Sequence, residues 1–141
     1  MWVIIFALSL VFMQERLFAD ASYYFFHSIN QGFPQVDHQR FVLAISEALP
    51  LLGSYLGLPL KILVAVYSIG HVLFAFILFQ QVYLKHGSVG HGLLILLLQF
   101  TAYSILWFSP MLEFWYGLIL LVYLDHRLYA QRTSGLKNLL L

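Results

Sequence analysis

One stretch of the chain, Leu60 to Leu84, is apolar over a length that limits what the rest can fold into. Its large polar side chains are Lys61 at one end and His71, Gln80 and Gln81 within it. A helix of about 20 apolar residues crosses the roughly 30 Å hydrocarbon core of a bilayer. The sequence therefore predicts a transmembrane helix here.

The composition extends this prediction to the whole chain. Of the 141 residues, 62% are hydrophobic and 9% are charged, whereas soluble domains carry about 25% charged residues. A soluble protein of this size needs more charged residues on its surface than this chain has. We therefore expect an integral membrane protein. The net charge of +1, from scattered basic residues, excludes a nucleic-acid footprint. The absence of cysteine removes disulfides and thiolate metal sites.

Three more segments have the apolar character of membrane spans. The sequence thus predicts an all-α, polytopic protein with a single membrane domain, residues 1–141, whose spans are about 1–18, 60–84, 89–108 and 111–129. The first segment lacks the basic region and cleavage site of a signal peptide, so we interpret it as a retained helix. Ser109 and Pro110 are expected to turn the chain between the last two spans.

The polar interlude between the first two spans, about 19–58, is expected at the membrane–water interface. Asp20 to Asn30 combines Tyr, Phe and His, a mixture favoured at that depth. Gln31 to Pro34 is typical of a turn, because glycine permits positive φ and proline restricts the residue before it. From His38 to Leu56, apolar residues recur at steps of three and four, which predicts an amphipathic helix, bent or restarted at Pro50.

This amphipathic segment has two predicted faces. The apolar face holds Phe41, Ile45, Leu49, Leu52 and Leu56, and the polar face holds Arg40, Glu47 and Ser54 at steps of seven. A helix of this kind lies in the interface rather than across the bilayer. Gly57 and Pro59 are expected to end it and to start the next helix.

Basic residues predict the orientation. Lys85, Arg127, Arg132 and Lys137 fall on one side of the predicted spans, and the opposite Ser109–Glu113 turn has none. The positive-inside rule makes the first side cytoplasmic. The N-terminus is then cytoplasmic, and residues 19–58 lie outside on the same side as Glu113.

Two acids on this outer side are candidates for catalysis. Asp20 follows the first span, where a carboxylate could accept a proton or hold a divalent cation over a lipid head group. Its simpler interpretation is an interfacial acid or a helix cap. Glu113 could meet Asp20 in one pocket, or could simply be an acid stabilised by a helix N-terminus. Arg40 and Lys61 could bind a phosphate diester or only lipid head groups.

The histidines suggest weaker hypotheses. His71 lies deep in its span and is a functional candidate, although a neutral ring bonded to Gln99, Tyr103 or a backbone carbonyl is the simpler interpretation. His27, His38 and Asp37 form no recognisable metal motif, so the metal content stays unknown. Haem is not expected, because no second histidine lies at the depth of His71. Instead, three histidines could cluster at the cytoplasmic edge: His86, His91 and His126.

The order of these features resembles the N-terminal part of the GT-C superfamily of membrane glycosyltransferases, and in particular uncharacterised bacterial membrane proteins related to it. The resemblance rests on two stretches: Arg16-Leu17-Phe18-Ala19-Asp20-Ala21-Ser22-Tyr23-Tyr24, and His38-Gln39-Arg40-Phe41 through Glu47-Ala48-Leu49-Pro50. It implies a bacterial inner-membrane location and a sugar donor carried on polyprenyl phosphate. It also implies that Asp20 is the base or metal ligand of the first outer loop, that Glu113 is a second acid, and that a divalent cation is a possible cofactor.

The chain also departs from that superfamily. It has no Asp-Glu or Asp-x-Asp pair and only about four spans, so we expect a fragment, a reduced relative or one part of an assembly, inactive alone. The alternative is a non-catalytic small membrane subunit or scaffold whose outer segment binds a partner or lipid. Membrane lipid and a further membrane subunit are expected partners on either interpretation.

Overall fold

The structure is a computed structural model that describes residues 1–18, 20–36, 41–100 and 113–139, with side chains in the last stretch for residues 115–130. Within these ranges all regular elements are helices, as predicted. They are α1 (Trp2–Val11), α2 (Asp20–Gln31), α3 (Leu43–Tyr55), α4 (Leu60–Phe79), its π-helical continuation η2 (Gln80–Lys85), α5 (Val89–Leu98) and α7 (Glu113–Leu139).

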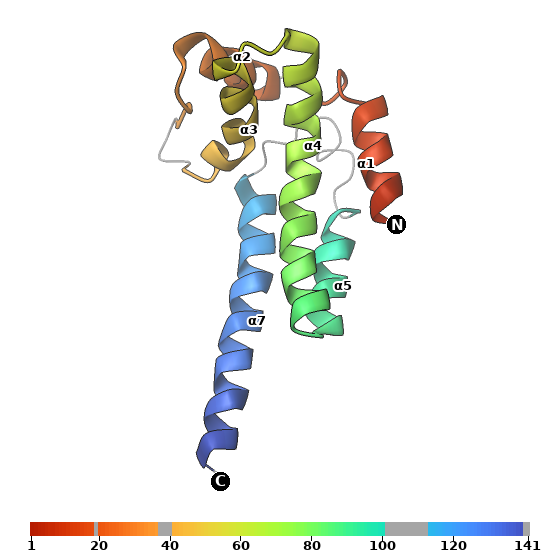
Figure 1. Cartoon of the computed structure of the whole chain (residues 1–141), viewed down its shortest axis with the longest axis vertical. Coiled ribbons are helices and arrows are strands. Elements are labelled where there is room, and N and C mark those ends of the chain that lie inside the picture. The colour runs from red at the N-terminus through yellow and green to blue at the C-terminus, as the bar shows by residue number, and fades with distance from the viewer. Residues whose placement is uncertain (19, 37–40, 101–112, 140–141) are drawn as a thin grey trace.

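Helix α4 is the axis around which the others are arranged (Figure 1). Helices α1, α5 and α7 each pack along it, and α2 and α3 gather at the end where α4 begins. Together α4 and η2 form one helix, Leu60–Lys85, and this is the helix of the described ranges that is long and apolar enough to cross a membrane. The prediction of a spanning helix over 60–84 is therefore supported in length and composition.

The other predicted spans differ from the observed helices. Helix α1 ends at Val11 rather than near 18, and residues 12–17 form turns and a bend. Helices α1 and α5 have 10 residues each and rise about 15 Å, half the thickness of the hydrocarbon core. Most of the remainder of the predicted 89–108 span, and the Ser109-Pro110 turn, lie outside the described residues.

Helix α7 is longer than predicted. Its 27 residues run from Glu113 to Leu139, past the expected end near 129, and rise about 40 Å. The sequence from 130 to 139 contains no proline, and a single glycine does not stop a helix. The helix therefore continues about ten residues beyond the expected end of the last span.

The predicted breaks on either side of α3 are confirmed. Gly32 and Gly57 both adopt positive φ, 74° and 70°, which glycine allows without a steric penalty. Pro59 is extended at the N-cap of α4, with φ −65° and ψ 149°. By contrast, the expected restart at Pro50 is wrong, because α3 is one helix with Pro50 buried inside it between packed neighbours.

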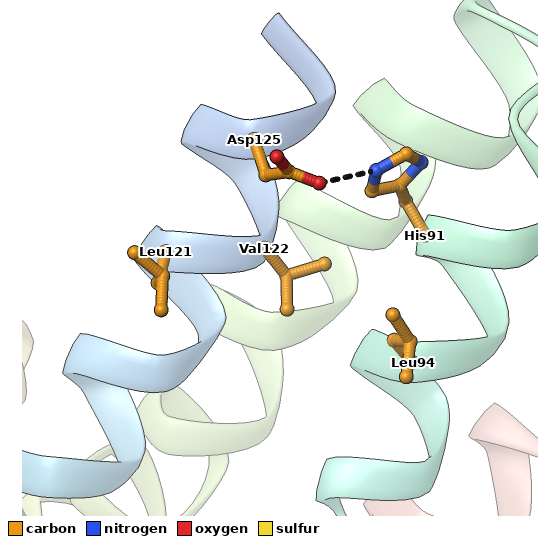
Figure 2. Close-up of a pocket in the computed structure, with 5 residues that line it drawn as sticks. All are labelled: His91, Leu94, Leu121, Val122 and Asp125. Atoms are coloured by element: carbon orange, nitrogen blue, oxygen red, sulfur yellow. Dashed lines mark hydrogen bonds and ion pairs between the residues drawn. The ribbon is translucent and has the colours of Figure 1, made fainter. Parts of the chain in front are cut away.

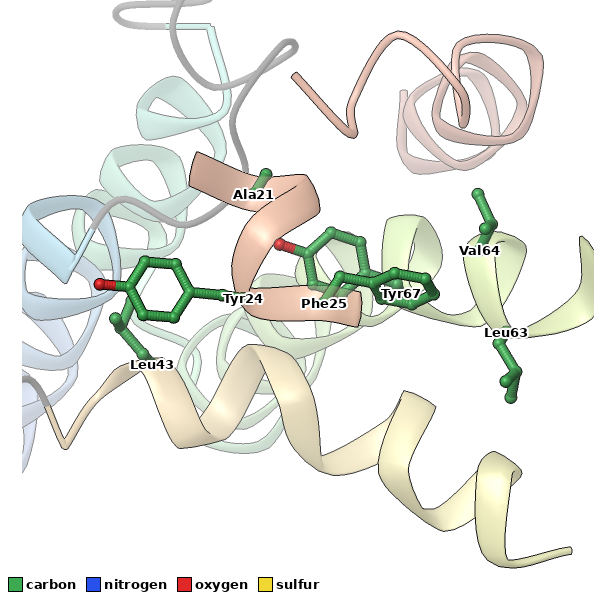
Figure 3. Packing of buried hydrophobic residues seen from close by; sticks show 7 residues of the cluster. All are labelled: Ala21, Tyr24, Phe25, Leu43, Leu63, Val64 and Tyr67. Atoms are coloured by element: carbon green, nitrogen blue, oxygen red, sulfur yellow. The ribbon is translucent and has the colours of Figure 1, made fainter. Parts of the chain in front are cut away.

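Two apolar clusters hold the helices together. Figure 3 shows the first, in which α2 and α3 pack against the first half of α4 through Ala21, Tyr24, Phe25, Leu43, Leu63, Val64 and Tyr67. The second joins α4, η2, α5 and α7 through Ala75, Val82, Ile95, Trp115, Tyr116 and Ile119. We call α2 and α3 the α2–α3 layer, since the first cluster fixes them as a unit at one end of α4.

Candidate functional site

Asp20 is the first residue of α2, and its side chain is exposed. The next residue, Ala21, is completely buried in the first cluster. Successive residues of a helix point in different directions, so Ala21 is buried while the Asp20 carboxylate stays accessible. A negative charge in the first turn also interacts favourably with the helix dipole. The exposed position of Asp20 is therefore compatible both with a helix-capping role and with a catalytic role.

The helix that carries Asp20 is fixed by aromatic packing. Phe25 is fully buried and its ring lies 5.1 Å from that of Tyr67 on α4, at an interplanar angle of 55°. On the outer side Tyr23 stacks on His27, with centroids 5.3 Å apart and planes at 13°. The aromatic residues of α2 therefore lie on two sides of the helix, with Phe25 buried against α4 and Tyr23 exposed beside His27.

Arg16, four residues before Asp20, is buried although the sequence places it among polar residues. Its side chain is 1% exposed. It interacts electrostatically with the phenols of Tyr67 on α4 and Tyr116 on α7. Burial lowers the pKa of Arg16 to about 10, while Tyr116 and Tyr67 act in the opposite direction, so the guanidinium stays protonated at neutral pH.

Glu47 is also buried, which contradicts its predicted place on a solvent-facing polar stripe. It is 0% exposed, and its Oε2 accepts a hydrogen bond of 2.7 Å from the backbone N–H of Gln35. The predicted apolar residues Phe41, Leu52 and Leu56 are exposed instead. Glu47 can be buried although it belongs to the predicted polar face, because its carboxylate is hydrogen-bonded inside the layer.

The remaining predicted site residues are placed in part. Lys61 is exposed in the first turn of α4. Arg40 lies outside the described residues. Glu113 is the first residue of α7, but its side chain is outside the described set, and so is the predicted meeting with Asp20.

His71 is 4% exposed at the centre of the bundle. Its ring stacks on Trp115 with centroids 3.9 Å apart and planes at 25°, and its Nδ1 is 3.3 Å from the hydroxyl of Tyr116. The sequence proposed Gln99 or Tyr103 as partner. Gln99 is buried next to the end of α5 and Tyr103 lies outside the described residues, so the phenol of Tyr116 is the partner that sequence reasoning missed.

The three histidines expected at the other end of α4 do lie together. The ring of His126 on α7 is 5.1 Å from that of His86 and 5.3 Å from that of His91. Next to them is a groove of about 310 Å³ between α5 and α7, lined by His91, Leu94, Leu121, Val122 and Asp125. Figure 2 shows its polar end, where His91 Nε2 is 3.0 Å from Asp125 Oδ2.

The side chains of this histidine cluster are not arranged as a metal-binding site. Within the described ranges, no three His, Asp or Glu side chains are arranged to hold a metal ion. In comparisons with known proteins, no family model, curated protein or solved structure matches the chain.

Proposed function

We propose that the chain forms the N-terminal membrane part of a GT-C-type glycosyltransferase that uses a sugar carried on polyprenyl phosphate. Asp20 is the proposed catalytic group. The observation that supports this is the position of its carboxylate, exposed on the first turn of α2, in a layer packed against the end of the membrane-spanning helix α4. A reacting group held there is presented at the depth of a lipid head group.

A bilayer around the bundle is supported by its apolar exterior. Large apolar side chains are exposed on every helix described, among them Val3, Val11, Phe26, Leu52, Ile77, Leu84, Leu94, Leu97, Leu121, Leu124 and Leu128. Soluble monomers rarely expose a contiguous apolar patch of more than a few hundred Å². We therefore place α1, α4 with η2, α5 and α7 in a bacterial inner membrane, with the N-terminus cytoplasmic and the α2–α3 layer outside.

The inverted faces of α3 support the interfacial position of that layer. Leu52 and Leu56 are 57% and 70% exposed, whereas Glu47 is fully buried. A helix in contact with water would turn the carboxylate outward and the leucines inward. Lipid around the edge of the layer accounts for the opposite arrangement, since apolar side chains then face a solvent that accepts them.

The chemistry requires a base and compensation for charge. The Asp20 carboxylate takes the proton of an acceptor hydroxyl, whose oxygen then bonds to the anomeric carbon of the sugar. The bond from that carbon to the phosphate oxygen breaks, and polyprenyl phosphate leaves with the electron pair. A divalent cation, if Asp20 and Glu113 hold one, would offset the charge on the leaving phosphate. Lys61, and Arg40 from the same layer, are the candidate contacts for the phosphate itself.

The test is transfer of a radiolabelled sugar from polyprenyl phosphate in membranes carrying the full-length protein. Asp20→Asn is expected to abolish transfer, because the amide cannot accept a proton. Glu15→Gln is the matched control, since Glu15 is an exposed acid in the turn before α2, and it should transfer normally. Full activity of Asp20→Asn would exclude the catalytic role and favour a non-catalytic subunit that binds a lipid or protein partner.

A further inference from the structure

The groove between α5 and α7 has a polar end that the proposed sugar transfer does not use. In Figure 2 His91 and Asp125 face each other at this end, and the rest of the groove is lined by Leu94, Leu121 and Val122. We propose that Ser88, His91 and Asp125 form a nucleophilic site that cleaves a fatty-acyl ester whose chain lies in this groove. This second activity is independent of the sugar transfer, because it belongs to the opposite end of α4.

The three side chains are linked in the order hydroxyl, imidazole and carboxylate. Ser88 Oγ lies 2.7 Å from His91 Nδ1, and His91 Nε2 lies 3.0 Å from Asp125 Oδ2. When the carboxylate accepts the Nε2–H, the lone pair of the ring is on Nδ1, which can then take the hydroxyl proton. A serine hydrogen-bonded to a base that a third group orients is the arrangement that activates the hydroxyl as a nucleophile.

Ser88 is also the N-cap residue of α5, which offers a purely structural role for its hydroxyl. A capping serine bonds to a backbone N–H in the first turn of the helix. Ser88 makes no such bond, and its hydroxyl contacts the His91 ring instead. The first N–H groups of α5 therefore stay available, next to the hydroxyl, for the oxygen of a bound carbonyl.

The backbone around Ser88 leaves room for such a carbonyl. Ser88 stands between Gly87 and Gly90, and a Cβ on either glycine would meet nothing within 4 Å. Gly87 has a positive φ of 66°, and the N–H of Ser88 donates to the carbonyl of Val82 at 3.1 Å. The turn from η2 into α5 thus holds the serine in place while its approach is open.

His126 supplies an independent sign that a ligand belongs here. Its side chain is 3% exposed, yet neither ring nitrogen has a hydrogen-bond partner in the described part of the chain. Its ring lies edge to face with that of His91, with centroids 5.3 Å apart. A neutral imidazole carries one N–H donor, and burying that donor without an acceptor is unfavourable. An ester oxygen bound beside His91 would provide the acceptor.

The lining of the groove selects an apolar chain. Its volume of about 310 Å³ is within the range of small-molecule sites, and Leu94 and Leu121 are 51% and 61% exposed along it. Because α5 and α7 are placed in the bilayer, an acyl chain can enter from the lipid. The side chain of Asp125 is 73% exposed, so the polar end can also reach water. A lipid ester at the membrane edge meets both requirements.

The reaction has two halves. Ser88 Oγ bonds to the ester carbonyl carbon while the hydroxyl proton passes to His91 Nδ1, and the carbonyl oxygen takes up negative charge near the N-terminus of α5. The bond from that carbon to the alcohol oxygen breaks, and the alcohol leaves with the proton from His91. Water then attacks the acyl group on Ser88, its proton passes through His91 to Ser88 Oγ, and a fatty acid is released.

A covalent probe tests the nucleophile directly. A long-chain alkyl fluorophosphonate reacts with an activated serine by loss of fluoride, and peptide mass spectrometry locates the adduct. Full-length protein in detergent should be labelled at Ser88, at least roughly 10²-fold faster than His91→Gln. Ser54→Ala is the matched control, since it removes a partly exposed serine of α3, and it should be labelled like the wild type. Folded wild type without an adduct at Ser88 would overturn the proposal, even if the groove binds the chain.

Hydrolysis of p-nitrophenyl esters measures the complete reaction. Ser88→Ala should fall to the rate of detergent buffer, and Asp125→Asn should lower kcat/KM by roughly 10²–10⁴-fold. Glu15→Gln, which removes an exposed acid far from the groove, should keep the wild-type rate. A wild-type rate in either Ser88→Ala or Asp125→Asn would overturn the site. Labelling of the wild type needs no variant, so it decides the case if a variant fails to fold.

The chain length of the ester tests the groove. The wild type should favour longer acyl chains by roughly fourfold for each methylene that becomes buried. Leu94→Trp fills the groove and should reduce the ratio of octanoyl to acetyl ester hydrolysis. Leu97→Trp changes a leucine of α5 that is 57% exposed and outside the lining, and it should keep that ratio. Equal ratios in the two variants would overturn the placement of the acyl chain.

Discussion

The carboxylate of Glu47 on α3 is hydrogen-bonded to the backbone N–H of Gln35 at 2.7 Å, and both residues are buried. The bond closes the connection between α2 and α3 from the inside. It adds a polar link to the apolar cluster that holds α2 and α3 together.

Loss of this bond should destabilise the protein. Glu47→Leu leaves the N–H of Gln35 buried without its acceptor, which costs about 1–3 kcal/mol, whereas Glu47→Gln keeps an acceptor oxygen and should cost less. Unfolding in detergent by heat or denaturant measures both variants. Glu15→Leu, at an exposed position in the turn before α2, is the control. Equal stability of Glu47→Leu and Glu15→Leu would contradict the account of the α2–α3 layer.

Helix α1 is docked on α4 by one inter-helix hydrogen bond that can be removed cleanly. Ser68 Oγ donates to the carbonyl oxygen of Ser9 at 2.6 Å in a buried position. Ser68→Ala should lower the free energy of unfolding by about 0.5–1.5 kcal/mol. Ser28→Ala is the control, because Ser28 Oγ bonds only to the carbonyl of Phe25 within its own helix, at 3.0 Å. We expect the free energy of unfolding of Ser28→Ala to be near that of the wild type. Equal destabilisation of Ser28→Ala and Ser68→Ala would show that the hydrogen bond between α1 and α4 has no special role.

Two glycines of α5 should respond oppositely to alanine. A Cβ on Gly92 would lie 2.8 Å from the Cβ of Tyr83 in η2, while a Cβ on Gly90 would meet nothing within 4 Å. The atom in the way is next to the backbone and cannot rotate aside, so Gly92→Ala should cost about 1–3 kcal/mol through overpacking. Gly90→Ala should gain up to about 1 kcal/mol from helix propensity. Thermal unfolding of the two variants in the same detergent measures both effects. A Gly92→Ala variant as stable as the wild type would mean that α5 does not pack on η2 this closely.

The proposed orientation can be tested with single cysteines. Asn30 at the end of α2 and Lys85 at the end of η2 are both exposed and lie at opposite ends of the α4 axis. In intact cells an impermeant maleimide should label Asn30→Cys and leave Lys85→Cys unlabelled until the membrane is opened. Permeabilised cells, in which both should react, control for accessibility. The reverse pattern in intact cells would invert the topology.

Much of the helical layout could be predicted from local chemistry. The apolar run from Leu60, the positive φ at Gly32 and Gly57, and the extended Pro59 depend on neighbouring residues alone, so the sequence was sufficient there. The ends of α1 and α7 were predicted less well. The chain leaves α1 at Val11 although Phe12 and Met13 are apolar, and nothing in the local pattern marks that point.

The burial of charged residues near the candidate site could not be predicted from the sequence. Arg16 follows the polar residues Gln14 and Glu15, and charged side chains such as those of Arg16 and Glu47 are normally exposed. Inside the protein Arg16 interacts electrostatically with Tyr67 and Tyr116, and Glu47 with Tyr67, and both tyrosines come from helices further along the chain. Period-seven spacing placed Glu47 on a polar face, but only tertiary packing could decide that its side chain is buried.

The surroundings of Arg16 also impose an order of events during synthesis. Arg16 is synthesised before Tyr67 and Tyr116. Its guanidinium cannot be buried beside these two phenols until both residues have been made. The interior around Arg16 is therefore complete only once the start of α7 has been made. The turn before α2 thus reaches its final packing later than its place in the sequence suggests, because that packing depends on a helix that lies far along the chain.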